Sequence, residues 1–265
     1  MAGKVLTVIP AVPETTMKNS HFRTILLRRL RLPLDLTPSR CRCHGLLDVF
    51  GDHRAACPTA GVLGNRGVPL EKMAARVCRE AGARVTTNNY VRDLNLDVIR
   101  RDDRRIEVIA NGLPLWNGAQ IAVDTTLLSP VKRNGQPQPH TADRAGAWLD
   151  EARRRKENTY PELIGSRRCR LTVLGAEVGG RWSEEALRFL RLLARAGART
   201  APEGLRAATG RAFLSRWSGF LAVAAQRSFA ASLLGEPLAG ASCVDGAVPD
   251  LSEVLDDSRF DVPGR

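Results

Sequence analysis

Aromatic residues, acidic residues and long apolar runs are all scarce in this chain of 265 residues. No apolar run approaches the roughly 20 residues that a membrane-spanning helix needs, so we do not expect a membrane protein. The N-terminal segment is too short and is interrupted too soon, at Pro10, to be a secretory signal, which favours an intracellular protein. Aromatic side chains make up only 5% of the residues, so stacking on unpaired bases is a weaker expectation than contact with a nucleic-acid backbone.

Positive charge is in excess, with 40 Lys and Arg against 28 Asp and Glu and a formal net charge of +12. This charge favours a polyanionic partner, because each phosphate that is neutralised releases counterions. Arginine dominates the basic residues and suits bidentate phosphate contacts. The alternative is a coding sequence biased toward arginine, whose side chains are simply solvated. The hydrophobic fraction of 43% is sufficient for a folded core.

Composition and turn signals divide the chain into five segments. They are a basic lead-in over 1–40, a Cys/His module over 41–66, an α/β core over 67–182, C-terminal helices over 183–235 and a tail over 236–265. Within the lead-in we expect an extended segment over 1–19 and an amphipathic helix over 20–31. The Gly, Pro, Asp and Ser of the tail predict disorder.

Hydrophobic periodicity predicts the elements of the core and of the C-terminal region. The expected helices span 69–82, 143–160, 183–198, 202–215 and 216–234, and the expected strands span 83–87, 105–110, 118–128 and 169–178. Asn-Gly at both ends of the connector 111–118 indicates a hairpin. This order predicts a mixed sheet with antiparallel pairing at its first hairpins and helices on its faces.

Two carboxylates lie on neighbouring predicted strands, Glu107 in Arg-Ile-Glu-Val and Asp124 in Ala-Val-Asp-Thr. If the turn is centred in the connector, Glu107 lies opposite Ala122, and Asp124 is its diagonal neighbour on the same face, roughly 7–8 Å away. Two such carboxylates can converge on one cation, and Mg²⁺ suits a site with one or two carboxylates plus a phosphate. The alternative is structural, since an aspartate at the end of a strand often binds loop amides.

A lysine and a tyrosine continue the apolar stripe of the helix over 143–160. The stripe is Ala145, Trp148, Leu149 and Ala152, followed by Lys156 and Tyr160. This spacing orients Lys156 toward the sheet, where it can act on the attacking water or neutralise the developing charge on a phosphate. Tyr160 can position a phosphate oxygen, and Arg153 shares that side of the helix. The alternative is that Arg-Arg-Arg-Lys is a solvated run of charge.

Three cysteines and a histidine predict a metal site near the N-terminus: Cys41, Cys43, His53 and Cys57. Four such ligands form a closed tetrahedral zinc site, which is structural because no position remains open. His44 is an alternative ligand, with poorer geometry because it adjoins Cys43. Buried free thiols with an unrelated histidine are the other possibility. Asp52, next to His53, is a candidate for orienting a ligand.

The run Cys-Arg-Cys-His-Gly, followed by Phe-Gly-Asp-His-Arg-Ala-Ala-Cys, resembles the zinc knuckle that precedes the restriction-like endonuclease of some non-LTR retrotransposon polyproteins. Downstream, Arg-Ile-Glu-Val, Ala-Val-Asp-Thr-Thr-Leu and Lys-x₃-Tyr are similar to that endonuclease, a variant of the PD-(D/E)XK nuclease fold. The resemblance covers about residues 21–235 and is closest to divergent dinoflagellate proteins of this type.

The resemblance implies roles for four residues. Glu107 and Asp124 take the places of the family's two acids, and Lys156 and Tyr160 take those of the helical lysine and tyrosine. Ile-Glu replaces the family's Pro-Asp, and the separation of the acids, 124 − 107 = 17, is longer than usual there.

The resemblance also implies a function: a metal-dependent DNA endonuclease, nuclear, with structural Zn²⁺, catalytic Mg²⁺ and no small-molecule cofactor. No polymerase motif is present, so the chain would correspond to the C-terminal piece of such an element, as a fragment or a domesticated gene. The first alternative is a non-catalytic nucleic-acid-binding protein that retains the fold. The second is an interaction domain that uses the helices over 183–234.

Overall fold

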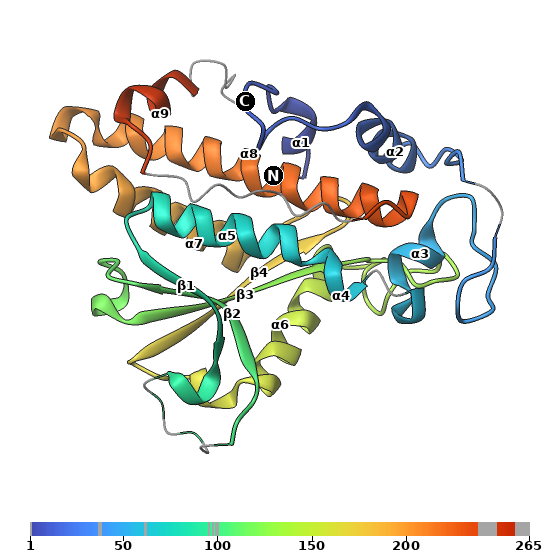
Figure 1. Cartoon of the computed structure of the whole chain (residues 1–265), viewed down its shortest axis with the longest axis horizontal. Coiled ribbons are helices and arrows are strands. Elements are labelled where there is room, and N and C mark those ends of the chain that lie inside the picture. The colour runs from blue at the N-terminus through green and yellow to red at the C-terminus, as the bar shows by residue number, and fades with distance from the viewer. Residues whose placement is uncertain are drawn as a thin grey trace.

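The computed structural model describes residues 2–36, 39–60, 63–94, 96, 98, 101–237 and 248–257. Its centre is a four-stranded sheet in the order β1-β2-β3-β4 (Figure 1). The strands are β1 (Arg84–Tyr90), β2 (Arg105–Asn111), β3 (Gln120–Leu128) and β4 (Cys169–Glu177). The β1–β2 and β2–β3 pairs are antiparallel, and β3 and β4 are parallel. The predicted mixed sheet flanked by helices is therefore confirmed.

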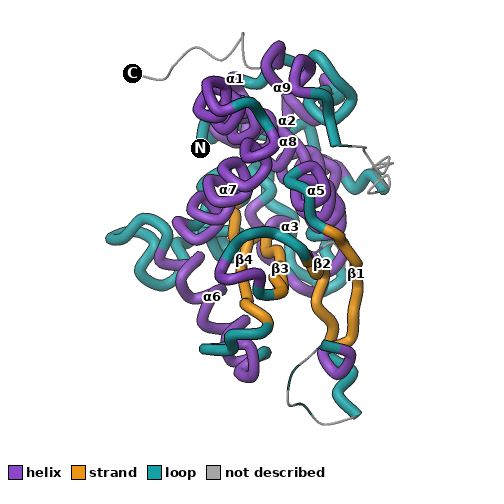
Figure 2. Tube along the Cα trace, turned by 90° about the vertical axis from the view of Figure 1, so that its left-hand side faces the viewer, coloured by secondary structure: helices purple, strands orange, loops and turns teal. Residues whose placement is uncertain are grey.

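Helices cover both faces of the sheet. The helices are α1 (Lys4–Thr7), α2 (Asn19–Arg29), α3 (Asp52–Ala56), α4 (Leu63–Arg66), α5 (Val68–Glu80), α6 (Ala147–Thr159), α7 (Glu184–Gly197), α8 (Arg206–Leu234) and α9 (Leu251–Asp257). Short 3-10 turns span Pro58–Ala60, Val91–Asp93, Trp116–Gly118, Pro161–Leu163, Ala198–Thr200 and Glu203–Leu205. Helix α6 lies on one face of the sheet and α5 and α7 on the other (Figures 1 and 2). Helix α8 packs over α5 and α7, and α1, α2 and α9 pack on α8.

Side-chain alternation along β3 separates the two faces. Ile121 and Val123 join the large apolar core beneath α5, α7 and α8. Ala122 joins a smaller cluster on the other face, which includes Tyr160 at the end of α6. Asp124 follows the alternation of Ala122, so its carboxylate lies on the α6 side of the sheet.

The predicted pairing of β2 with β3 is wrong by two positions. Val108 pairs with Val123 and Ile109 with Ala122, a register that places Glu107 across from Asp124 rather than opposite Ala122. The connector is asymmetric, because one left-handed residue, Gly112, lies early in it and three lie late, over Trp116–Gly118. Its centre therefore lies one residue later than a symmetric turn predicts, and the two carboxylates are direct rather than diagonal neighbours.

The two predicted helices over 202–215 and 216–234 are one continuous helix, α8. Arg216, at the predicted junction, is 7% exposed and contacts acids on two other elements. Its Nε lies 3.3 Å from Oε2 of Glu80, and its Nη2 lies 3.0 Å from Oε1 of Glu253. Trp217 donates a further hydrogen bond to Glu80. Because the charge is neutralised inside the protein, the helix does not need to break there.

Both chain ends depart from the sequence prediction within the described residues. The expected disorder over 236–265 is wrong for α9, where Val254 is fully buried. The expected extended segment over 1–19 contains α1, whose Val5 is buried among residues of α8. The rest of the predicted tail, 238–247 and 258–265, lies outside the described residues. No helix in the described part of the chain is long and apolar enough to cross a membrane.

Candidate active site and metal centre

Lys156 of α6 meets Asp124 of β3 in an ion pair, with 2.6 Å between Nζ and Oδ1. Leu149 and Ala152 are buried, and Lys156 follows them at helical spacing, so its predicted orientation toward the sheet is confirmed. One member of the predicted stripe is wrong: Ala145 is exposed and precedes the first residue of α6. The lysine side chain remains 29% exposed, whereas that of Asp124 is only 1% exposed.

Both carboxylate oxygens of Asp124 are buried and accept no hydrogen bond from the described residues. The Lys156 ammonium, 2.6 Å from Oδ1, is the charged partner of this carboxylate. Burying a carboxylate is costly unless it is hydrogen-bonded or paired, and a buried acceptor without a donor needs a physical explanation. A bound cation is one such explanation.

Glu107 lies beside Asp124 at the same end of the sheet. Its Oε2 accepts a hydrogen bond of 2.5 Å from the backbone N–H of Thr125. Burial, followed by the charges of Asp124 and Glu71, raises the pKa of Glu107 to about 8. Carboxylates that share a site raise one another's pKa because they cannot all ionise at low cost. Without a cation, Glu107 therefore holds its proton at neutral pH.

Glu71, in the first turn of α5, is a third acid of this cluster. Burial and the charge of Asp124 raise the pKa of Glu71, while Lys156 and Lys72 lower it. No sequence pattern singled out this residue. An acid in the first turn of a helix ordinarily complements the helix dipole, so its position carried no distinct signal. Asp124, Glu107, Glu71 and Lys156 together are called the carboxylate cluster below.

Tyr160 lies at the end of α6 but makes a different contact from the one expected. Its hydroxyl donates a hydrogen bond of 2.7 Å to the carbonyl oxygen of Arg105. Burial, followed by the charges of Asp124 and Glu107, raises the pKa of Tyr160, so the phenol stays protonated. The side chain thus ties the end of α6 to the start of β2.

Cys41, Cys43, His53 and Cys57 converge as predicted, with their ligand atoms all within 4.8 Å of one another. The Sγ atoms of Cys41 and Cys57 are 3.9 Å apart, and Sγ of Cys43 is 3.2 Å from Nε2 of His53. Zn–S bonds of about 2.3 Å imply S–S edges of roughly 3.8 Å in a tetrahedral site, close to the 3.9 Å between Cys41 and Cys57, and the mixed S–N edge is shorter, roughly 3.5 Å. A disulfide would need the sulfurs at about 2.05 Å. The cluster can therefore hold a metal ion such as zinc.

The turn before α3 explains why His53 rather than His44 joins the cluster. The carboxylate of Asp48 accepts hydrogen bonds from the backbone N–H groups of Phe50, Asp52 and His53, at 2.9, 3.1 and 2.7 Å. These three hydrogen bonds fix the start of α3 and orient the His53 imidazole toward the three cysteines. A Cβ at Gly45 would lie 2.7 Å from Cε1 of His53, so the ring packs directly against a glycine. His44 adopts a left-handed conformation with φ 64° and stays outside the ligand group.

The role expected for Asp52 is wrong. Its carboxylate forms ion pairs with Arg28 and Arg31 at 2.9 and 2.5 Å, and these lower its pKa although burial raises it. Asp52 therefore ties the Cys/His module to the lead-in next to α2. A second link is Arg66, which donates to the carbonyl oxygens of Ala55 and Leu127 at 2.9 Å each. The module is thereby joined to the end of β3.

Within the described part of the chain, no other group of three or more Cys, His, Asp or Glu side chains is arranged as tightly as the Cys/His cluster. The carboxylate oxygens of Asp124, Glu107 and Glu71 are therefore not gathered as closely as the ligand atoms of the Cys/His cluster. Comparison with models of known protein families gives no match, and comparison with curated proteins gives no significant similarity.

Proposed function

We propose that this protein is a metal-dependent endonuclease that hydrolyses phosphodiesters of DNA at the carboxylate cluster. The observation that carries the proposal is Asp124: a buried carboxylate whose two oxygens accept no hydrogen bond from the described residues. A buried acid whose ion pair is with a partly exposed lysine, beside a second acid with a raised pKa, is typical of a site for a cation and an anionic substrate.

The residues fit Mg²⁺, a hard cation that takes oxygen ligands and keeps several waters. Asp124 and Glu107 would hold it, and Glu71 adds negative charge to the same site. When bound, Mg²⁺ polarises a phosphoryl oxygen and lowers the pKa of a water. Cation binding also favours the ionised form of Glu107, whose pKa is otherwise about 8.

Lys156 has a second use once the charge of Asp124 is neutralised. Its side chain is 29% exposed, so the ammonium can move from Asp124 to a phosphate oxygen at the mouth of the site. There it would orient the phosphate and stabilise the charge that develops on it in the transition state. Tyr160, whose hydroxyl donates a hydrogen bond to the carbonyl oxygen of Arg105, would keep the end of α6 in position and with it Lys156.

A DNA partner is supported by an arginine surface on α7 and α8. Four exposed arginines recur at helical spacing along α7 and just beyond it: Arg188, Arg191, Arg195 and Arg199. Arg206 and Arg211 of α8 join Arg191 and Arg195 around a cavity of about 460 Å³ between the two helices. None of the six forms an ion pair with a carboxylate in the part of the chain that is described. Unpaired arginines in a row favour contact with successive phosphates.

The same surface favours the alternative, a nucleic-acid-binding protein without catalysis. That protein would bind DNA with a strong salt dependence through the arginines of α7 and α8, and its carboxylate cluster would be a structural remnant. Substitution of Asp124 separates the two functions. Cleavage requires that residue, whereas contact between the arginine surface and the DNA backbone does not.

The resemblance to non-LTR retrotransposon endonucleases supports proposals on the bound metal, the fold, the descent and the location of this protein. We propose zinc as the ion of the Cys/His cluster, since three thiolates and an imidazole are its usual structural ligands. We also propose a restriction-endonuclease-like core, descent from a non-LTR retrotransposon and a nuclear location. The support is the order of the groups, with an acid on β2, an acid on β3 and a lysine on α6.

Nicking of a supercoiled plasmid tests the proposal. Purified full-length protein in Mg²⁺ is expected to nick the plasmid, and omission of divalent cation is expected to stop it. Asp124→Asn should lower the rate by at least about 100-fold, since it removes a ligand from the transition-state site. Asp150→Asn, which removes an exposed carboxylate from α6, is the matched control and should retain the rate. Equal nicking by both variants, or none by the native protein, would overturn the proposal.

A further inference from the structure

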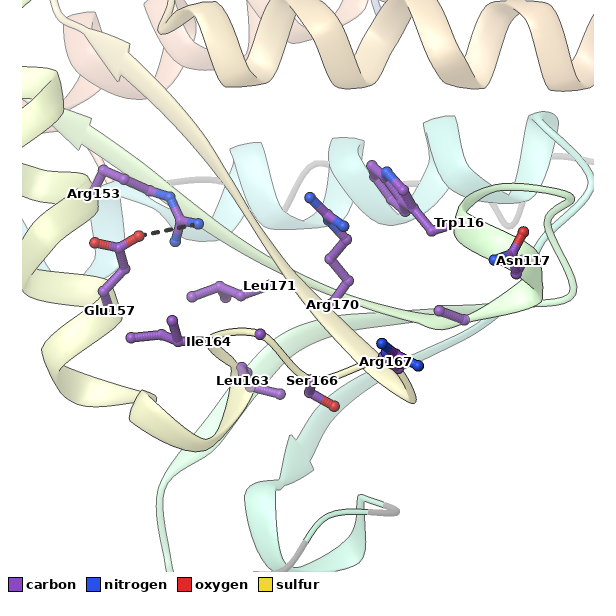
Figure 3. A pocket seen from close by; sticks show the side chains of 12 residues that line it. Trp116, Asn117, Arg153, Glu157, Leu163, Ile164, Ser166, Arg167, Arg170 and Leu171 are labelled. Atoms are coloured by element: carbon purple, nitrogen blue, oxygen red, sulfur yellow. Dashed lines mark ion pairs between the residues drawn. The ribbon is translucent and has the colours of Figure 1, made fainter.

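A second cavity lies beside the edge strand β4, with a volume of about 610 Å³. Its walls come from the turn over Trp116–Gly118, from α6, and from the loop that leads into β4. The side chains that matter most are Trp116, Arg153, Glu157, Ile164, Arg167 and Arg170 (Figure 3). This volume falls in the range of roughly 300–1,000 Å³ typical of small-molecule sites. We call it the edge cavity.

The edge cavity carries more positive than negative charge. Arg153 pairs with Glu157 and with Glu185, at 3.5 and 2.9 Å. Its Nη1 is nevertheless buried without a hydrogen-bond partner among the described residues. Arg167 and Arg170 form no ion pair with the carboxylates that the structure describes. The charge of Arg170 does act on Glu185, the partner of Arg153, but three arginines against these two acids leave an excess of positive charge that favours an anionic ligand.

An apolar surface separates these cations. Figure 3 shows Arg153 on one side of the cavity and Arg167 and Arg170 on the other, with Leu171 and Ile164 between them. Ile164 is 56% exposed although it is a large apolar side chain. A ligand with a flat apolar part and a charged part would cover this surface and reach the arginines.

Trp116 holds one arginine in place. Its ring stacks on Phe189 of α7, with centroids 6.2 Å apart, and the Arg170 guanidinium lies 5.0 Å from the Trp116 centroid. Trp116 and Asn117 both have positive φ, 46° and 59°, although neither is a glycine. Such backbone strain gathers at ligand-binding sites, where it presents a side chain in one fixed direction.

The edge cavity adjoins the carboxylate cluster. Two residues of the cavity wall, Arg153 and Glu157, lie on α6 three positions before and one position after Lys156. Three residues of helix rise by only about 4.5 Å, so the cavity wall is close to Lys156 along the helix. On the sheet, Leu171 of the cavity pairs with Ala122, two positions before Asp124. A strand whose phosphate reaches Lys156 can therefore continue into the cavity.

We propose that the edge cavity binds one unstacked nucleotide of a nucleic-acid strand. Its phosphate contacts Arg167 and Arg170, and its base lies on the apolar surface of Ile164 and Leu171. The choice of a nucleic-acid strand rests on the proposed function, but nucleotide binding itself requires no hydrolysis. The cavity thus supplies a contact with a base, which the arginine surface of α7 and α8 does not.

Calorimetric titration of the full-length protein with deoxyadenosine monophosphate, without Mg²⁺, tests this inference. Binding is expected, and Arg167→Ala and Arg170→Ala should each weaken it by about tenfold, the effect of losing a charged hydrogen bond. Arg168→Ala, which removes the neighbouring arginine outside the cavity lining, should leave it unchanged. Deoxyadenosine and inorganic phosphate alone should both bind at least about tenfold more weakly than the nucleotide, because each makes only part of the contacts.

Several results would overturn the inference. They are no binding of the nucleotide, unchanged binding by Arg170→Ala, or inorganic phosphate that binds as tightly as the nucleotide. Asp124→Asn separates this inference from the proposed function, because it should abolish nicking and leave nucleotide affinity intact. If the protein nicks DNA but does not bind the nucleotide, only the inference about the edge cavity is rejected. If it binds the nucleotide but does not nick DNA, only the proposed nuclease activity is rejected.

Discussion

The Lys156 ammonium lies 2.6 Å from Oδ1 of Asp124, and this ion pair joins α6 to the centre of the sheet. It is the one ion pair found for the Asp124 carboxylate among the described residues. A buried acid that depends on a single movable cation is stable only while that cation, or another, stays beside it.

Removing the lysine should therefore destabilise the protein when no divalent cation is present. Lys156→Ala leaves the Asp124 carboxylate buried and unneutralised, and it should lower the free energy of unfolding by about 3 kcal/mol. Urea denaturation without added Mg²⁺ measures this. The double variant Lys156→Ala, Asp124→Asn should recover part of the loss. Arg154→Ala, an exposed neighbour on α6, is the control and should change stability by less than about 1 kcal/mol. Equal losses for the two single variants would contradict the account.

Glu107 should make stability depend on pH. Its pKa of about 8 lies above its ordinary value of 4.5, so the folded state binds a proton that the unfolded state releases between these pH values. The stability from this group is complete below about pH 4.5 and is lost as pH rises through about 8. The difference in unfolding free energy between the native protein and Glu107→Gln, measured without Mg²⁺, should therefore fall between pH 5 and pH 9. A difference that rises with pH would show that the carboxyl is ionised in the folded state.

The two histidines of the Cys/His module should behave differently. His53→Ala removes a ligand and should lower the zinc content, measured by mass spectrometry, well below one ion per chain. It should also lower the melting temperature, because metal binding contributes to folding. His44→Ala lies outside the ligand group and should retain both the zinc and the melting temperature. Loss of zinc in both variants, or in neither, would reject His53 as the ligand.

Helix α9 should contribute measurably to stability, although the sequence predicts disorder there. Val254 is fully buried in the large apolar core, so Val254→Ala should cost about 2 kcal/mol of unfolding free energy. Ser252→Ala, on an exposed position of the same helix, is the control. If Val254→Ala has no effect in denaturant titration, α9 does not pack on α8 in solution.

Local sequence patterns predicted much of the fold and the site, because helical and strand periodicity and the spacing of ligands depend on residues that are near one another in the chain. Helical spacing from Leu149 through Ala152 is enough to aim Lys156 at the sheet. The spacing of Cys41 and Cys43 brings two thiols into one turn, and α3 with the residue that follows it supplies the remaining ligands. The order of elements follows from hydrophobic periodicity in the same way.

What the sequence did not predict depends on contacts between distant residues. The continuity of α8 at Arg216 requires Glu80 and Glu253, which lie 136 and 37 positions away. The register of β2 with β3 depends on left-handed residues such as Trp116, a residue type that rarely adopts that conformation. Glu71 joins the carboxylate cluster only because α5 packs with its first turn near Asp124, which no local pattern records.

We propose that the carboxylate cluster around Asp124 is a divalent-cation site. Titration with Mn²⁺, a paramagnetic substitute for Mg²⁺, monitored by electron paramagnetic resonance, tests it most directly. The zinc-loaded native protein should bind one Mn²⁺ ion that Mg²⁺ displaces, and Asp124→Asn should lose that ion while keeping its zinc. Equal Mn²⁺ binding by the native protein and Asp124→Asn, or no binding by either, would contradict the account.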